Sequence, residues 1–137
     1  MSPVLYLSVG VSDFDRSLAF YDAVLGTIGH RRASEPSGGW ATWGPGYDDG
    51  VSFSICKPFD GQTASAGNGT MIAFGGKNAE AVKAFHDAAL KHGGSSEGAP
   101  GTRDAYGPHF YVAYVRDPDG NKLACAHHHY NGGATQG

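Results

Sequence analysis

The spacing of apolar residues changes along the first 26 residues of the chain, and the change separates a predicted strand from a predicted helix. Val4 to Val11 is mostly apolar or β-branched, which is typical of a strand. After it, the Ser-x-x-acid pattern of Ser12 to Asp15 resembles a helix capping box, and Gly26 is placed to end the helix. Between these signals, apolar side chains recur every three or four positions, as on one face of an amphipathic helix: Phe14, Leu18, Tyr21 and Leu25.

Three further apolar runs follow before residue 58. Ile28 to Ala33, Gly39 to Trp43 and Val51 to Lys57 are each bounded by glycine- or proline-containing turns, which predicts three strands. The first half of the chain therefore reads as β-α-β-β-β.

The same order begins again after a segment of small and polar residues, Asp60 to Gly69. Thr70 to Phe74 is predicted as a short strand, and Asn78 as the N-cap of a second helix. Glu97 to Pro108 is rich in glycine and proline and is predicted as a long loop. The second helix is predicted from its narrower apolar stripe of Val82, Phe85 and Ala89.

A hairpin is predicted to close the second half, because Asp117 to Gly120 (Asp-Pro-Asp-Gly) separates the strand-like runs Phe110 to Arg116 and Asn121 to His128. If Asp117 and Gly120 close the turn, the register follows. This register places three cross-strand pairs on one face of the sheet: Ala113 opposite Ala124, Tyr111 opposite Ala126, and His109 opposite His128. Tyr114, Leu123 and Cys125 then line the other face.

An internal repeat organises these elements. Phe20 to Leu25 matches Phe85 to Leu90 at an offset of 65 residues, with four of six positions identical. A duplicated unit of about 60 residues predicts a single α+β domain over residues 1–137. Its parts are module one (about 4–58), a linker (about 59–69), module two (about 70–129) and a flexible tail (130–137). Two curved mixed sheets are expected to form a cleft.

Composition narrows the classes of partner. A formal net charge of -3 with no basic stripe argues against nucleic acid and membrane surfaces as partners. No apolar run is long enough to span a membrane, and the N-terminus lacks the layout of a signal peptide, so a cytoplasmic protein is expected. Cys56 and Cys125 have no metal-binding spacing and are expected to be reduced thiols.

Two segments carry a resemblance to a known family. Val11 to Gly26 (Val-Ser-Asp-Phe-Asp-Arg-Ser-Leu-Ala-Phe-Tyr-Asp-Ala-Val-Leu-Gly) opens module one, and Asp117 to Lys122 (Asp-Pro-Asp-Gly-Asn-Lys) closes module two. Together with the paired modules they resemble the vicinal oxygen chelate superfamily, the group of glyoxalase I, bleomycin resistance proteins, fosfomycin-modifying enzymes and extradiol dioxygenases. The resemblance implies the β-α-β-β-β cleft fold over about Val4 to His128, and a homodimer.

The resemblance also implies where a metal would be held. Members that use a divalent ion supply ligands from the first and last strands of each module, and here these positions are Tyr6, Ser54, Met71 and Ala124. None is an imidazole or a carboxylate, the groups that such ions favour in these sites. No cofactor is therefore predicted. A zinc, nickel, manganese or iron site that includes His109 and His128 remains the alternative.

The predicted cleft is apolar and aromatic. Strand faces turned away from the helices are expected to line it, and Arg103, in the predicted loop, is a candidate to meet a ligand carboxylate or phosphate. For each aromatic residue, core packing is the competing interpretation. The candidate ligand-binding residues are Tyr6, Trp40, Trp43, Ser54, Met71, Arg103, His109, Tyr111 and Ala124.

Two functional hypotheses remain open. The favoured one is a metal-free protein that binds a small aromatic or amphipathic molecule, as the antibiotic resistance proteins of the family do. The alternative is a glyoxalase- or dioxygenase-type enzyme, with a displaced metal site or with Tyr6 and Tyr111 as acid/base groups. The sequence assigns no catalytic residue and does not name the ligand.

Overall fold

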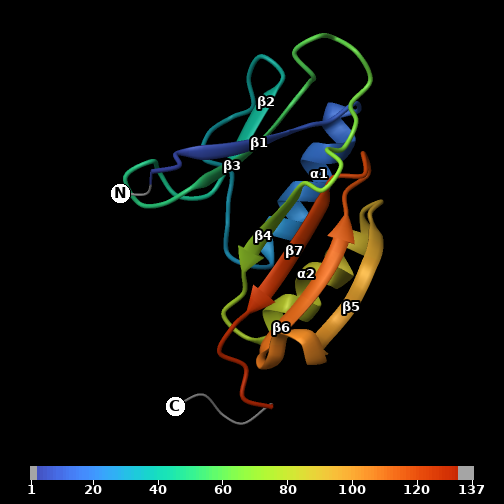
Figure 1. The fold of residues 1–137 in the computed structure, drawn as a ribbon. Helices are drawn as coiled ribbons and strands as arrows, with labels where there is room; N and C mark the ends of the chain where they lie inside the picture. The colour runs from blue at the N-terminus through green and yellow to red at the C-terminus, as the bar shows by residue number, and fades with distance from the viewer. Residues whose placement is uncertain (1–2, 133–137) are drawn as a thin grey trace.

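Seven strands, two α-helices and one short 3-10 helix make up the computed structural model, which describes residues 3–132 (Figure 1). In chain order the elements are β1 (Tyr6–Gly10), α1 (Phe14–Gly26), β2 (Trp40–Trp43), β3 (Ser52–Cys56), β4 (Met71–Gly75), α2 (Ala79–Lys91), β5 (Ser95–Arg103), η1 (Asp104–Tyr106), β6 (Gly107–Arg116) and β7 (Lys122–His127). The predicted α+β class is confirmed, with both helices where the apolar stripes place them.

Each module contributes one mixed sheet. The first has the strand order β1-β3-β2, and the second has the order β4-β7-β6-β5. In both sheets the first strand of the module runs parallel to its last strand, and the other neighbours are antiparallel. The two sheets are thus related by the repeat found in the sequence.

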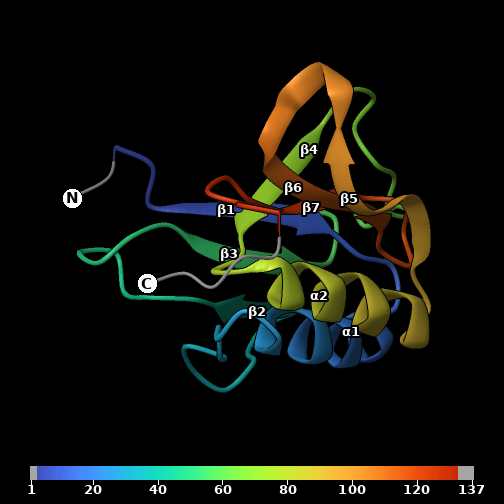
Figure 2. The same cartoon turned by 90° about the horizontal axis from the view of Figure 1, so that it is seen from below.

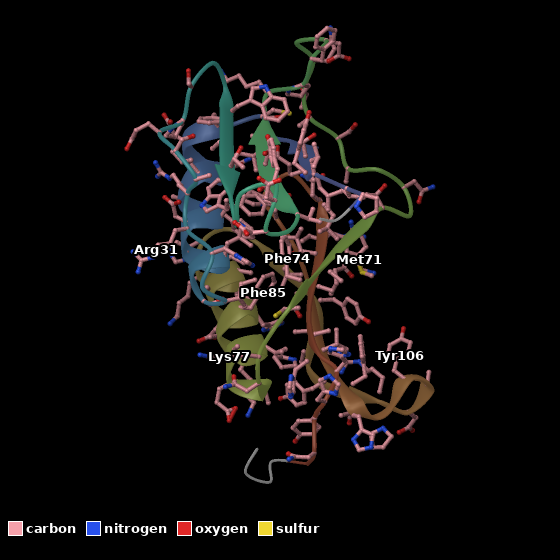
Figure 3. All side chains as sticks on the ribbon, turned by 90° about the vertical axis from the view of Figure 1, so that its left-hand side faces the viewer. Arg31, Met71, Phe74, Lys77, Phe85 and Tyr106 are labelled. Carbon is pink, nitrogen blue, oxygen red and sulfur yellow. The ribbon has the colours of Figure 1, made fainter. Side chains whose placement is uncertain are left out.

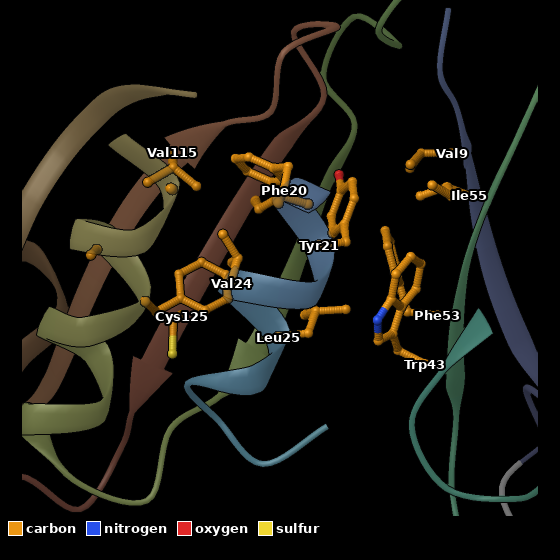
Figure 4. Packing of buried hydrophobic residues seen from close by; sticks show 14 of the residues in the cluster. Val9, Phe20, Tyr21, Val24, Leu25, Trp43, Phe53, Ile55, Val115 and Cys125 are labelled. Carbon is orange, nitrogen blue, oxygen red and sulfur yellow. The ribbon is translucent and has the colours of Figure 1, made fainter. Parts of the chain in front are cut away.

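The helices lie side by side, and each sheet packs one face on this helical layer (Figure 2). Helix α1 lies between the two modules, with Tyr21 against Trp43 and Phe53 of the first sheet and Phe20 turned toward the second (Figure 4). Phe20 and Phe85, which the repeat aligns, are both fully buried. The other face of each sheet, away from the helices, is called its open face below.

Three predictions about local structure are wrong. Residues 28–33 form no strand and make one isolated bridge, from Arg32 to Trp43, so the first sheet has three strands instead of four. Residues 97–108 are not a loop, because β5, η1 and the start of β6 occupy them. The cap of α1 is Asp13, whose side chain accepts from the Arg16 amide, whereas the Ser12 hydroxyl accepts from Ala64 N of the linker. The predicted cap of α2, Asn78, is confirmed by its bond to Ala81 N.

The predicted register of the β6–β7 hairpin is wrong by one residue. The pair that closes it is Asp117 and Asn121, because the Asp117 amide donates to the Asn121 carbonyl while the Gly120 amide donates back to the Asp117 carbonyl. Gly120 has φ +89°, the left-handed conformation that adds a third residue to the loop. Tyr111 therefore faces His127, and Ala124 faces Tyr114.

The hairpin turn also joins the two modules. The Asp119 carboxylate accepts from the Ser12 amide and the Ser17 hydroxyl, and it lies 3.7 Å from the Arg16 guanidinium at the start of α1. A carboxylate is favourable there because the first amides of a helix carry partial positive charge. The motif that closes module two is therefore bonded to the start of the helix of module one.

Within residues 3–132, no helix is long and apolar enough to cross a membrane. Residues 133–137 of the predicted tail lie outside the described residues. Tyr130, at the start of the predicted tail, has its ring centroid 4.7 Å from that of Tyr111.

Candidate functional site

Three aromatic side chains gather on the open face of the first sheet. Tyr6 begins β1 and Trp40 begins β2, and their rings meet edge to face with centroids 6.3 Å apart. Tyr47, from the loop before β3, stacks on Tyr6 at 6.0 Å. All three remain exposed, at 47% for Tyr6, 42% for Trp40 and 50% for Tyr47. This aromatic cluster is a large π surface that the described residues leave open.

Behind the cluster lies a row of hydroxyl groups. Thr42 and Ser54 are paired across β2 and β3, and their side-chain oxygens are 2.8 Å apart. Ser52 donates to the carbonyl of Pro45 in the loop that carries Tyr47. Ser54, a candidate from the sequence, is thus buried on the same sheet face as Tyr6 and Trp40 and is already hydrogen-bonded.

Trp43 lies on the opposite face of the same sheet, where it is 1% exposed. Its indole N–H donates to Asp22 Oδ1 at 3.0 Å. Hydrogen bonds from the Arg32 guanidinium to the Asp22 carboxylate lower the pKa of that carboxyl, so it stays an acceptor. Of the two tryptophans, Trp43 therefore has the core-packing position and Trp40 the exposed one.

The open face of the second sheet is polar and cationic. Tyr114 stands at its centre on β6, with the Arg103 guanidinium 5.9 Å and the Lys122 ammonium 5.3 Å from the ring centroid. Burial, and then a hydrogen bond with Tyr106, raise the pKa of the Tyr114 phenol. Tyr114 therefore stays neutral near pH 7 and does not cancel either positive charge.

Arg103 is the last residue of β5 and is folded back along its own strand. Its guanidinium donates to the carbonyls of Ala99 and Thr102. Gly98 makes room for it, because a Cβ there would lie 3.0 Å from both the Arg103 guanidinium and the Tyr114 ring. The predicted loop position of Arg103 is wrong, but the side chain does lie over an open face.

Met71 and Ala124 share this open face, since the register pairs Met71 with Lys122 and Ala73 with Ala124. Met71 is exposed, and Figure 3 shows it on the side of the sheet opposite Phe85 of α2. Ala124 is buried beside Tyr114. The four positions that the resemblance assigns to metal ligands thus all lie on open faces, two on each sheet.

These four positions do not fit a divalent ion. They offer a phenol, a hydroxyl that is bonded to Thr42, a thioether and a methyl group, where hard and borderline ions favour carboxylates and imidazoles. Across residues 3–132, no group of three or more His, Cys, Asp or Glu side chains is placed to hold a metal ion. No chemical step is therefore assigned to a metal here.

The corrected register also separates the predicted histidine pair. His109 Nδ1 donates to the carbonyl of Tyr130 at 2.7 Å, and the ring of His128 lies 4.1 Å from that of His129, tilted by 40°. Tyr111 is buried on the helix-facing side of the second sheet. His109 and His128 are therefore not opposite each other, and Tyr111 does not share an open face with Tyr6.

Sequence reasoning missed three residues of these faces: Tyr47, Tyr114 and Lys122. Tyr47 lies in a loop, which has no strand periodicity to place it. Tyr114 was placed on the wrong face of the sheet because the predicted hairpin register was wrong. Lys122 was not assigned to a face. Reading Gly120 as a left-handed bulge residue would have placed both correctly.

Comparisons with known proteins agree with the fold. The family model described as "Glyoxalase/Bleomycin resistance protein/Dioxygenase superfamily" matches residues 4–125. No curated protein sequence matches the chain significantly.

Solved structures give the same result. A glyoxalase/bleomycin resistance protein from Albidiferax ferrireducens T118 is 35% identical with a TM-score of 0.81, over 95% of this chain and 99% of that one. A glyoxalase-related enzyme from Fulvimarina pelagi has a TM-score of 0.72 at 17% identity, over 96% and 89% of the two chains, and so shares the fold. The chain belongs to the glyoxalase/bleomycin resistance protein/dioxygenase superfamily, also known as the vicinal oxygen chelate superfamily.

Proposed function

We propose that this chain is a metal-independent binding protein that holds a small aromatic or amphipathic molecule against its open sheet faces. The observation that carries the proposal is the exposed aromatic cluster of Tyr6, Trp40 and Tyr47. Exposed aromatic groups that already contact one another offer a stacking surface at little cost in side-chain entropy.

The residues at the family's metal positions support a metal-independent mode of binding. Tyr6 belongs to the aromatic cluster, and Ser54 forms part of the hydroxyl row beneath it. The side chains that replace the usual ligands are therefore suited to an organic molecule. Affinity would come from stacking and from burial of apolar area.

The enzyme alternative has weaker support. One form of it uses a displaced metal site that includes His109, whose Nδ1 is bonded to the Tyr130 carbonyl. The metal-free form needs two titratable groups near each other in the cleft, and the pair named from the sequence was Tyr6 and Tyr111. Tyr111 is buried on the other side of the second sheet, against Tyr130. No specific observation favours this second function.

We further propose that the chain acts as a homodimer. Each open face carries exposed side chains, such as Trp40 on the first sheet and Met71 on the second, that nothing within residues 3–132 covers fully. In this proposal the aromatic face of one copy and the cationic face of the other line the two sides of a ligand-binding space, which stays open to solvent when no ligand is bound. Sedimentation velocity tests this: the proposal expects twice the 14.3 kDa chain mass, and a monomer at micromolar concentration contradicts it.

Isothermal titration with 2-naphthol, a neutral flat probe, tests the binding function. Wild type and Phe59→Ala should bind equally, because the fully exposed Phe59 ring lies outside the cluster. Trp40→Ala should weaken binding about tenfold, and Trp40→Phe should restore most of it, since one stacked ring contributes about 1 kcal/mol or more. If wild type does not bind, or if Trp40→Ala binds as tightly as wild type, the proposal is wrong.

Metal content provides an independent check. Protein purified without added metal should contain far less than one equivalent of divalent ion by mass spectrometry. One bound equivalent per subunit would contradict the metal-independent part of the proposal.

A further inference from the structure

A hollow of ≈ 400 Å³ opens on the second sheet beside the segment that joins the modules. Its walls are Met71, Arg116, Lys122 and residues 66–70. The joining segment is fixed here by a turn, in which Thr70 N donates to the Gly67 carbonyl and Gly69 has φ +88°. Gly67 packs so closely that a Cβ would lie 2.3 Å from Thr70 Oγ1. This wall of the hollow is therefore an exposed turn with a defined backbone conformation.

Two cations lie next to each other in the lining of this hollow. Arg116 and Lys122 are directly paired in the register of β6 and β7, an arrangement that like charges disfavour. Arg116 is neutralised, because its Nε donates to Glu97 at 2.6 Å and its Nη1 donates to the Gly120 carbonyl. Arg116 also lowers the pKa of Glu97, so that carboxylate stays charged and bound to the arginine.

Lys122 has no such partner. Within residues 3–132 no carboxylate lies at ion-pair distance from its ammonium group, which lies over the Tyr114 ring instead. On the other side of Tyr114, Arg103 donates only to backbone carbonyls, so its charge is not neutralised either. This face therefore has an excess of positive charge on a chain whose formal net charge is -3. Because the net charge repels anions, attraction to an anion has to arise locally.

We propose that the hollow beside Lys122 binds the anionic group of the ligand, so that the ligand class is a flat aromatic oxyanion, either a carboxylate or a phosphate. Lys122 contacts the anion, the more distant Arg103 adds to the local positive field, and Asn68 and Thr70 provide polar groups in the wall. The inference rests on the proposed function and adds the charge of the ligand to it.

Three matched probes test the inference: 2-naphthoate, 2-naphthyl phosphate and the neutral 2-naphthamide. Wild type should bind at least one of the two anions about tenfold more tightly than the amide, the advantage of one charge-assisted contact. Which anion binds more tightly identifies the oxyanion. Lys122→Gln should remove the preference, so that the anions bind no more tightly than the amide. Lys83→Gln, which changes the net charge equally at an exposed position on α2, should keep it.

Equal affinity of all three probes for wild type would overturn the inference while leaving the proposed function intact. A preference that survives in Lys122→Gln would also overturn it. If no probe binds, the proposed aromatic site is wrong, and inorganic phosphate then tests the hollow alone by nuclear magnetic resonance. Phosphate-dependent shifts of the Gly67, Gly69 and Thr70 amides in wild type but not in Lys122→Gln would support the anion site, and the absence of shifts would overturn it.

Discussion

The Tyr21 hydroxyl donates a 2.6 Å hydrogen bond to Asp117 Oδ2, and the two residues are 96 positions apart, one in each module. Both are buried, and Asp117 also accepts from the Asp119 and Asn121 amides and the Asn121 side chain. The Asn121 side chain in turn donates to the Gly10 carbonyl of β1. The closing hairpin of module two is thus held to module one by a buried, fully bonded carboxylate.

Tyr21→Phe should destabilise the fold by about 1.5–3 kcal/mol, because Asp117 would lose a hydrogen bond to a buried charge. Urea denaturation measures the change. Tyr47→Phe is the matched control, since it removes a hydroxyl from a half-exposed ring, and it should alter stability by no more than about 0.5 kcal/mol. Equal stability of wild type and Tyr21→Phe would show that the bond does not hold the modules together.

Stability should fall in alkali partly through Cys125. Burial raises the pKa of this thiol to about 12, whereas in the unfolded chain a cysteine titrates near about 8.5. Between these values the unfolded state has lost the proton and the folded state keeps it. The free energy of unfolding therefore decreases as pH rises, by up to about 1.4 kcal/mol per pH unit for this group.

Urea denaturation from pH 8 to pH 11 checks this prediction. Cys125→Ala should show a shallower alkaline decline than wild type. Cys56→Ala should flatten the decline less, because Cys56 is only partly buried and burial raises its pKa by less. An unchanged profile in Cys125→Ala would rule out this thiol as a source of the pH dependence.

The same substitution at two glycines should have opposite effects. Gly98→Ala places a Cβ 3.0 Å from the Tyr114 ring and the Arg103 guanidinium, and should cost about 1 kcal/mol while displacing Arg103. Gly26→Ala meets no atom within 4 Å at the end of α1, and should stabilise the fold by about 0.5–1 kcal/mol. Thermal melts of the two variants compare them directly, and stabilisation by Gly98→Ala would contradict the packing described for Arg103.

Tryptophan fluorescence should distinguish the two faces of the first sheet. Trp43→Phe leaves only Trp40, whose emission should be red-shifted and readily quenched by acrylamide. Trp40→Phe leaves only the buried Trp43, whose emission should be blue-shifted and protected. If the two variants are quenched equally, Trp40 is covered, and the aromatic cluster is not open to a ligand.

Much of the fold follows from local signals in the sequence. The stripe containing Tyr21 and Leu25 placed α1, Asn78 placed the start of α2, and the Phe20 and Phe85 repeat related the two modules. The strand at residues 95–103 was missed because its glycines and proline disfavour strand conformation in isolation. The glycines of this strand leave space for the Arg103 side chain. The local sequence pattern does not reveal this packing.

The candidate site was less predictable than the fold. The resemblance to the family singled out Tyr6, Ser54 and Met71, which do lie on open faces, but the hairpin register depended on the conformation of a single residue, Gly120. A shift of one residue changes which side chains lie opposite each other, and so Tyr114 was placed on the wrong face relative to Ala124. The cationic groups around Tyr114 depend on that register, so the sequence did not bring them together.

The most direct test of the account is a titration of 2-naphthol into protein treated with excess chelator, repeated after adding zinc, nickel, manganese or iron(II). The account predicts the same dissociation constant under all conditions, with Trp40→Ala weakening binding in each. Binding that is lost on chelation and restored by one of these ions would contradict it, because the ligand would then be held through a metal.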